Sequence, residues 1–181
     1  FVEYNRKMYM QSLDPALRQY TVSMFGKKYL TPRKQGLFSL DGKPHEYKFS
    51  GVSVISVDAP PWLLALTAKA EAEWERLSQT KVRFTVVLAN RYENGLDRLG
   101  YHRDDEKAID QNFPIASVSL GCRRKFYVKF DKEPKITHKW TLGEGDLLFM
   151  KPGLQATARH SVPQEKKVQG VRYNLTFRVQ R

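Results

Sequence analysis

The sequence has a single cysteine and no long apolar stretch. Cys122 can form neither a disulfide within the chain nor a four-cysteine zinc site. A chain with a single cysteine fits a reducing intracellular compartment. The longest apolar run, over 62–66, is far shorter than the ~20 residues that span a bilayer. The chain opens at Phe1, without methionine and without a cationic segment followed by an apolar one, so we expect a piece of a longer protein.

Acidic side chains are scarce relative to basic ones. Asp and Glu number 19 against 31 Lys and Arg, so the net charge is +12. This excess predicts a polyanionic partner, with nucleic acid the common case and an anionic membrane the second. Hydrophobic residues make up 41% of the chain, which is enough for a core and excludes a disordered protein. Because there is no repeat, low-complexity tract or Gly/Ser linker, residues 1–181 are expected to form a single domain.

The first part of the chain mixes helical and extended patterns. Asp14 as a cap and Pro15 at the first helical position predict a helix over 14–24. The following elements are then expected in order: a basic loop or hairpin over 27–34, which leads into 36–41, a strand over 47–57 and a helix over 61–77.

The rest of the chain is nearly all β. Short apolar or alternating segments separated by Gly, Pro and Asp predict strands over 82–89, 115–120, 124–130, 139–142, 146–151 and 171–179. A short helical front followed by many strands predicts a mainly β protein with flanking helices, of the α+β class. We expect an antiparallel sandwich, barrel or jelly roll.

The last predicted strand, over 171–179, carries two kinds of side chain. Alternation places Arg172, Asn174, Thr176 and Arg178 together on one face and apolar side chains on the other. If the polar face meets solvent, the strand is an ordinary amphipathic one. If that face meets the interior, the two guanidinium groups need anions, and a small dicarboxylate could pair with them in bidentate fashion.

Two short patterns could bind a metal. In the His102-x-Asp104 pattern an imidazole and a carboxylate point the same way on an extended segment, although such a pair is common by chance. A distant histidine such as His160 would complete two histidines and one carboxylate around iron, with positions open for a cosubstrate and dioxygen. His45 and His138 have no carboxylate two residues away and are left out.

The order and spacing of His102, Asp104, His160 and the strand from Arg172 to Arg178 are restrictive together. They resemble the AlkB family of Fe(II)/2-oxoglutarate dioxygenases. Further segments that look like this family are 90–92, Asp97, 102–106, 114–121 and 145–150. Within the family the similarity is greatest to its eukaryotic members that repair duplex DNA, whose recognition elements resemble 25–27, 32–35 and 47–51.

This resemblance implies a double-stranded β-helix, or jelly roll. An N-terminal helix and nucleotide-recognition lid would cover 1–57, and a helix plus catalytic core 58–181. Fe(II) would be bound by the two histidines and Asp104. The residues implied to bind the cosubstrate 2-oxoglutarate are Asn90, Tyr92, Arg172, Asn174, Thr176 and Arg178. Among them, Arg178 would hold the distal carboxylate, and Arg172 would lie near the metal-chelating end or Asp104.

The implied activity is oxidative demethylation of 1-methyladenine and 3-methylcytosine in DNA, with release of formaldehyde, succinate and CO2. Tyr47, Phe49 and His102 would sandwich a flipped base, while Asp105 and Glu106 would contact its exocyclic amino group. The further implied base-recognition residues are Phe25, Arg33, Lys34 and Gln35. The implied phosphate contacts are Lys27, Arg123, Arg124, Lys166 and Lys167, with Lys28 and Lys125 as further candidates. Without the resemblance, Phe25, Tyr47 and Phe49 could equally be core residues, and the cations could equally be solvated surface charges.

Two departures leave the preferred substrate open. Segment 131–138 is short and of mixed charge where the duplex-repair members have a long basic loop, and Glu165 precedes the basic pair Lys166 and Lys167. The alternatives are a demethylase of methylated RNA and a catalytically idle nucleic-acid-binding module. The intact ligand set and both arginines argue against the idle module. The expectation is a monomeric, DNA-binding enzyme with no membrane partner and, from the eukaryotic resemblance alone, a nuclear location.

Overall fold

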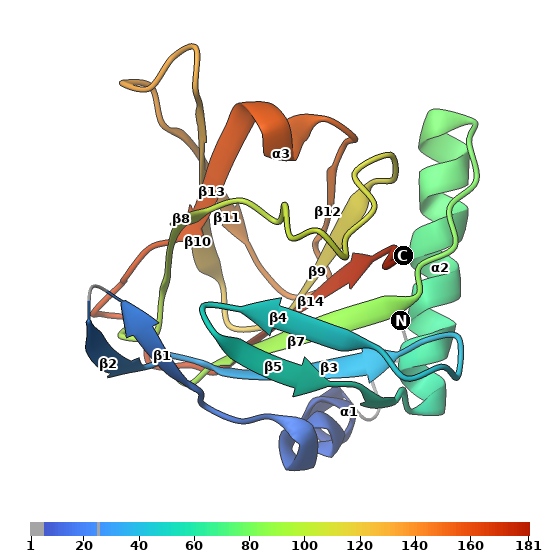
Figure 1. Ribbon diagram of the computed structural model, residues 1–181, viewed down its shortest axis with the longest axis horizontal. Helices are drawn as coiled ribbons and strands as arrows, with labels where there is room; N and C mark the ends of the chain where they lie inside the picture. Colours follow the sequence, from blue (N-terminus) through green and yellow to red (C-terminus); the bar gives the residue numbers. More distant parts are fainter. Residues whose placement is uncertain (1–5, 25) are drawn as a thin grey trace.

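Two β-sheets enclose the interior of the molecule in this computed structural model, which describes residues 6–24 and 26–181 (Figure 1). The larger sheet has the strand order β12 (Leu147–Met150), β9 (Ile115–Gly121), β14 (Arg172–Arg178), β7 (Val86–Tyr92), β3 (Lys34–Ser39) and β6 (Val57–Asp58). The smaller sheet has the order β11 (His138–Leu142), β10 (Arg124–Phe130), β13 (Ala158–Val162) and β8 (Leu99–His102). Buried apolar residues of both sheets pack together between them, which confirms the mainly β fold.

Helices and two hairpins flank the sheets. They are α1 (Arg6–Leu13), the 3-10 turn η2 (Asp14–Ala16), α2 (Pro61–Ser78), α3 (Leu154–Thr157), hairpin β1 (Thr21–Met24) with β2 (Lys27–Leu30), and hairpin β4 (Glu46–Phe49) with β5 (Val52–Ile55). Within the described ranges, no helix has the length and apolar character needed to cross a membrane.

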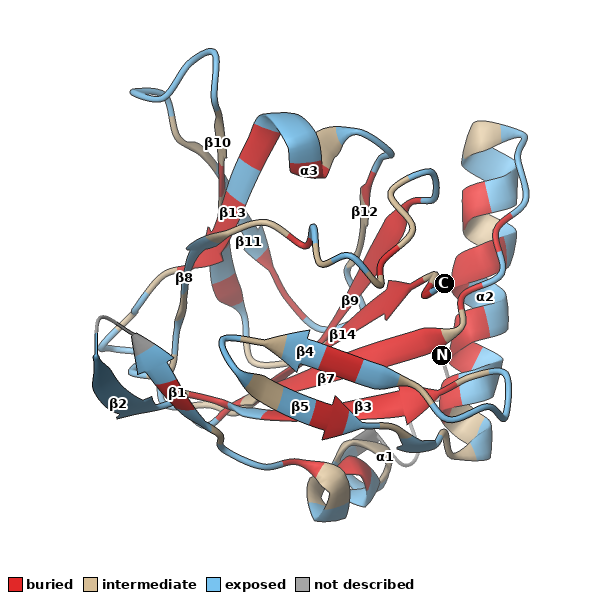
Figure 2. Cartoon of the chain, in the orientation of Figure 1, coloured by how far each residue is buried: buried red, intermediate tan, exposed pale blue. Residues whose placement is uncertain are grey.

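Helix α2 covers the outer face of the larger sheet. Leu63, Leu66 and Trp74 recur on one side of the helix and are buried against the sheet (Figure 2). They share one core cluster with Leu175 and Phe177 of β14. Burying each such side chain contributes roughly 1.5–3 kcal/mol. The helix predicted over 61–77 is confirmed, and this core fixes the sheet that carries the polar face of β14.

Strand β14 lies inside the larger sheet, paired with β7 on one side and β9 on the other. Its residues Tyr173 and Phe177 face the α2 core. The alternate residues Arg172 and Arg178 face the other way, yet only 1% and 3% of their surfaces are exposed, because the smaller sheet covers that side. The predicted alternation is confirmed, and the solvent-facing alternative is wrong.

The helix predicted over 14–24 is wrong. Only Asp14–Ala16 forms a helical turn, closed by a bond from the Leu17 N–H to the Asp14 carbonyl oxygen. Leu17 is already extended, and Thr21–Met24 pairs with β2. A local capping signal was outweighed by pairing with residues later in the chain, including the bridge between Arg18 and Gln35.

The strand predicted over 47–57 is in fact a hairpin followed by the short strand β6. The turn between β4 and β5 contains Ser50 and Gly51, with φ of 44° and 78°. Only glycine adopts such a φ freely, so the glycine at this position permits the reversal. The first residues of the strand predicted over 82–89 are not in a strand, while β8 and β13 were not predicted at all.

Candidate active site

The three metal-ligand candidates come together between the sheets. His102 ends β8 and is paired with His160 of β13, with ring centroids 4.2 Å apart. Oxygens of the Asp104 carboxylate lie 3.6 Å from Nε2 of His102 and 3.8 Å from Nε2 of His160. All three potential ligand atoms lie within 4.8 Å of one another. The ligand set predicted from spacing therefore forms one cluster.

Two of these side chains, His160 and Asp104, have the protonation states that a metal requires. Burial lowers the pKa of His160 to about 4, so its ring is neutral at pH 7. Burial alone would raise the pKa of Asp104, but Arg178 and the two histidines lower it to about 2. Nδ1 of His102 lies 2.9 Å from the Gly100 carbonyl oxygen, which leaves Nε2 for a metal. Two imidazoles and one carboxylate fit Fe(II) and leave positions for other ligands.

A pocket extends from these ligands along the inner face of the larger sheet. Five of the six predicted cosubstrate residues line it: Asn90, Tyr92, Asn174, Thr176 and Arg178. The lining residues that sequence reasoning missed include Ser117, Phe126 and Met150. Each lies in a segment predicted to be a strand, but only knowledge of the facing sheet tells which side of that strand meets the pocket.

Hydrogen bonds hold the amide side chains of the pocket in place. Asn174 donates to the Ser117 hydroxyl oxygen at 2.7 Å and accepts from the Thr176 hydroxyl at 3.2 Å. Nε of Arg33 donates to Oδ1 of Asn90 at 2.8 Å. The polar wall is therefore preorganised by partners on β9 and directly before β3, as a site that orients a small polar molecule needs to be.

The two arginines of β14 have different surroundings. Nη2 of Arg178 lies 2.9 Å from the Asp104 carboxylate, and its guanidinium group lies over the ring of Tyr47 at 5.4 Å. Arg172 donates to Ser119 at 2.8 Å and lies over the ring of Tyr92 at 5.5 Å. Each arginine keeps a buried Nε and Nη1 without a partner among the described residues.

These contacts correct the implied placement of the arginines. Arg172 was expected near Asp104, but Arg178 is the residue that pairs with this carboxylate. Alternation along a strand predicts which face a side chain takes, but it does not predict which end of the strand meets the metal ligands. Burial lowers the pKa of Arg172, which makes a carboxylate partner for its free donors favourable.

Tyr47 and Phe49 belong both to a small core and to the edge of the site. Tyr47 lines the pocket, and its hydroxyl donates to Oε1 of Glu106 at 2.5 Å. Burial raises the pKa of this hydroxyl, so it remains protonated. Phe49 is half-buried, packs edge-on against Tyr20 at 5.9 Å, and is not among the pocket-lining residues. The core interpretation therefore holds in part for both aromatic rings.

The other predicted base-recognition residues are divided between the pocket and the surface. Arg33 lines the pocket, and Gln35 is buried. Lys34 is exposed, on the opposite face of β3 by alternation. Asp105 is exposed as well, whereas Oε2 of Glu106 is buried without a partner among the described residues. Phe25, the remaining predicted base-recognition residue, lies outside the described residues.

The prediction that Arg124 contacts a phosphate is wrong. Its side chain is fully buried and pairs with the Glu165 carboxylate at 3.2 Å. It also donates to the carbonyl oxygens of Asn94, Asp97 and Pro163 at 2.7–2.9 Å. Each of its three guanidinium nitrogens donates to a loop residue and so joins that loop to β10, and the buried group is not available to a phosphate. The charge pattern alone could not distinguish this buried arginine from a surface one.

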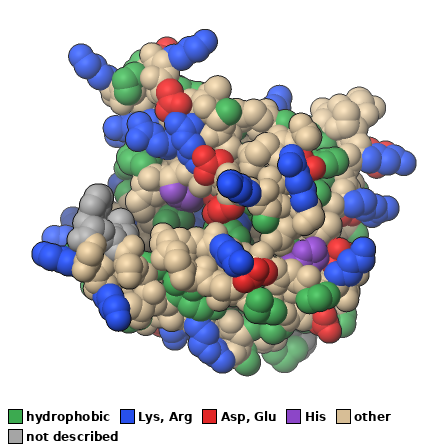
Figure 3. All heavy atoms as spheres, in the orientation of Figure 1, with side chains coloured by type: hydrophobic (Ala, Val, Ile, Leu, Met, Phe, Trp, Pro, Cys, Tyr) green, Lys and Arg blue, Asp and Glu red, His purple; other side chains and the backbone are tan. Residues whose placement is uncertain are grey.

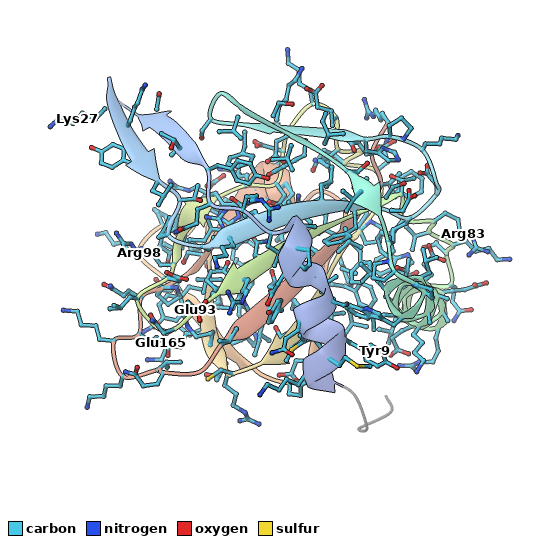
Figure 4. All side chains as sticks on the ribbon, turned by 90° about the horizontal axis from the view of Figure 1, so that it is seen from below. Tyr9, Lys27, Arg83, Glu93, Arg98 and Glu165 are labelled. Atoms are coloured by element: carbon cyan, nitrogen blue, oxygen red, sulfur yellow. The ribbon has the colours of Figure 1, made fainter. Side chains whose placement is uncertain are left out.

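The other predicted phosphate contacts are exposed. They are Lys27, Arg123, Lys166 and Lys167. Figure 3 shows basic side chains scattered over one face of the molecule, with acidic ones near the hollow at its centre. Figure 4 shows Lys27 at the tip of the β1–β2 hairpin, on the same side as Glu165, which directly precedes the exposed pair. These cations are available to a polyanion.

Comparisons with known proteins agree with this geometry. The sequence model of one protein family, the 2OG-Fe(II) oxygenase superfamily, matches residues 5–178. The DNA oxidative demethylase ALKBH2 of Mus musculus is 38% identical over 164 residues, which cover 87% of this chain and 65% of that protein. The alpha-ketoglutarate-dependent dioxygenase alkB homolog 3 of the same species is 35% identical over 128 residues, 66% of this chain and 43% of that protein.

A solved structure supports the same fold. The structure of OsALKBH1 superimposes with a TM-score of 0.68 at 17% identity, covering 99% of this chain and 92% of that one. The chain spans less than two thirds of the length of the first curated relatives that it matches. From the family model and the ligand cluster, the chain belongs to the 2OG-Fe(II) oxygenase superfamily, whose cofactor and cosubstrate are Fe(II) and 2-oxoglutarate.

Proposed function

We propose that this chain is an oxidative demethylase of N-alkylated bases in DNA, dependent on Fe(II) and 2-oxoglutarate. The observation that carries the proposal is the cluster of His102, Asp104 and His160 at the end of a pocket with buried guanidinium groups. A relative of similar sequence carries the name DNA oxidative demethylase. Fe(II) bound by these three residues would supply the oxidising chemistry: with 2-oxoglutarate and dioxygen, the methyl group would be hydroxylated and lost as formaldehyde, while 2-oxoglutarate would become succinate and CO2.

The chain's own residues bind and orient the cosubstrate. Arg172 has two buried donors without a partner among the described residues, and a dicarboxylate would satisfy them through its distal carboxylate. Arg178 offsets the charge of Asp104 and keeps that ligand ionised. Asn174 and Tyr92 line the path between the two ends. This arrangement exchanges the roles that the resemblance implied for the two arginines.

The damaged base would be bound beneath the β4–β5 hairpin. A ring-methylated adenine or cytosine carries positive charge and pairs poorly, so flipping it out of the stack costs less than flipping a normal base. Oε2 of Glu106 is a buried acceptor without a partner among the described residues, and it would bind the exocyclic amino group. Tyr47 holds the other oxygen of this carboxylate and turns its ring toward the pocket.

The exposed cations would bind the phosphates of the flanking strand. Lys27, Lys166 and Lys167 are the candidates, and any such contact weakens as salt rises. The choice between single-stranded and duplex DNA, the monomeric state and the nuclear location stay predictions.

One assay tests the proposal. Formaldehyde release is measured on oligonucleotides with 1-methyladenine or 3-methylcytosine, as single strands and duplexes, in DNA and in RNA. The expected result is release from methylated DNA that requires Fe(II) and 2-oxoglutarate and is absent in His160→Ala. Release from RNA alone would establish the RNA alternative, and binding without release would establish the idle module.

A further inference from the structure

The carboxylate ligand lies on backbone that no strand holds. Strand β8 ends at His102, whose partner in β13 is His160, and Asp104 follows in irregular structure. A ligand placed on a loop is less accurately positioned than one on a strand unless other groups fix it. The position of Asp104 therefore depends on what its peptide groups bind.

Two glutamine side chains hold these peptide groups. The Asp104 N–H donates to Oε1 of Gln155 at 2.9 Å. The Asp104 carbonyl oxygen accepts from Nε2 of Gln111, also at 2.9 Å. Gln155 is 4% exposed, so its amide is buried together with the peptide that it binds. Side chains thus supply the partners that a neighbouring strand would otherwise provide.

Gln155 is itself fixed on the element that leads to His160. It belongs to α3, which runs directly into β13 (Figure 1). Its Nε2 donates to the sulfur of Met150 at 3.4 Å. The backbone carbonyl oxygen of Gln155 accepts from Nη1 of Arg103 at 2.8 Å. Arg103, which lies between His102 and Asp104 in the sequence, is therefore also bound to α3.

Arg103 completes the connection on the outer side. Alternation turns it away from His102 and Asp104, and its guanidinium group donates to both carboxylate oxygens of Asp131, at 2.9 and 2.7 Å. It also donates to the carbonyl oxygen of Ala158 at 3.3 Å. The loop of Asp104 and the strand of His160 are thus joined through Gln155 from inside and through Arg103 from outside.

We propose that Gln155 is a positioning residue, which sets the Asp104 carboxylate relative to His160 by binding the Asp104 peptide. The proposal rests on the metal site of the proposed function. It makes no use of the methylated substrate. A residue with only a packing role would support folding but would leave the metal affinity unchanged once the protein had folded.

Cobalt binding tests this role directly. Gln155→Met keeps the length and volume of the side chain and removes the acceptor for the Asp104 N–H. Co(II) is titrated into the metal-free protein, with its visible absorption spectrum and the melting temperature recorded. Because loss of a partner behind a metal ligand typically costs 10–100-fold in affinity, we expect about a tenfold weaker Co(II) affinity and an altered spectrum.

Gln180→Met is the matched control. Gln180 is also a buried glutamine whose side chain donates to a carbonyl oxygen, that of Glu46 in β4, and its backbone bridge is to Ile109, which is not one of the three metal-ligand candidates. This variant should lower the melting temperature and leave the affinity and spectrum of Co(II) unchanged. Gln155→Glu, which keeps the acceptor, should restore the wild-type spectrum. An unchanged spectrum and affinity in Gln155→Met, or equal losses in Gln180→Met, would overturn the proposal.

Three further results are decisive. If Gln155→Met does not fold, Gln111→Met tests the carbonyl group on the other side of Asp104 from a half-buried loop, and an unchanged Co(II) affinity there overturns the proposal. If the wild-type chain binds Co(II) through His160, as judged by His160→Ala, but demethylates nothing, the proposed function fails and the positioning role stands. If the wild-type chain binds no Co(II), both fail.

Discussion

The inner faces of the two sheets differ from the two hairpins of the N-terminal third in how their strands are paired and buried. Strand β14 is paired on both sides, and its arginines are almost fully buried. Hairpin β1–β2 pairs only with itself, and every residue of β2 is exposed. Hairpin β4–β5 also pairs only with itself and is attached through Tyr47 and Val54.

This difference separates the chemistry from the recognition. Register between strands fixes the two histidine ligands and the cosubstrate residues, and a change of one residue in register would turn them to the other face. A two-stranded hairpin is only marginally stable alone, so the residues on it depend on a few side-chain contacts. Recognition residues can therefore change while the metal site stays intact, and the predictions below test this separation in order of decreasing effect.

The largest effect is expected inside the sheets. His160→Ala removes one of three ligands and should reduce formaldehyde release to below about 1% of wild type, because two remaining ligands bind iron weakly. Circular dichroism should still report a folded chain, since the lost side chain leaves the strand pairing of β13 in place. Turnover close to wild type would remove His160 from the ligand set.

A smaller effect is expected at the far end of β14. Arg172→Lys keeps the charge but loses the planar donor pair, so the KM for 2-oxoglutarate should rise roughly tenfold, the equivalent of about 1.5 kcal/mol for one charge-assisted bond. Oligonucleotide affinity, measured by fluorescence anisotropy, should not change. A normal KM together with weakened oligonucleotide binding would place Arg172 in the recognition surface instead.

A modest effect is expected in the pH dependence of stability. The folded pKa of His160 is about 4, below its ordinary value of 6.5, so the unfolded chain binds the proton more readily. Stability of the metal-free protein should therefore fall as the pH decreases from about 6.5 to 4, and further as Asp104, with a pKa of about 2, begins to titrate. The free energy of unfolding, measured with urea at each pH, should depend less steeply on pH in His160→Ala than in wild type. Equal slopes would mean that the buried histidine does not contribute.

Sequence patterns predicted the face of β14 because alternation is a local property. They did not predict its direction relative to the metal ligands, which depends on how the strand is threaded between β7 and β9. Strand β13 was missed because the short segment 158–162 has neither alternation nor flanking turn residues on both sides. Arg124 was misplaced because the carbonyl groups that bind it come from loops distant in sequence.

The separation of chemistry from recognition is tested most directly by Phe49→Ala. Succinate and formaldehyde are measured together, because succinate reports cosubstrate turnover and formaldehyde reports attack on the base. The resemblance implies that Phe49 stacks on the flipped base, and loss of one such aromatic costs about 1–3 kcal/mol, or ten- to hundredfold in affinity. We predict that formaldehyde release falls by such a factor while succinate formation continues, so that their ratio departs from the near-equal yields of wild type. A parallel loss of both products, together with a large drop in melting temperature, would contradict the account and assign Phe49 to the core alone.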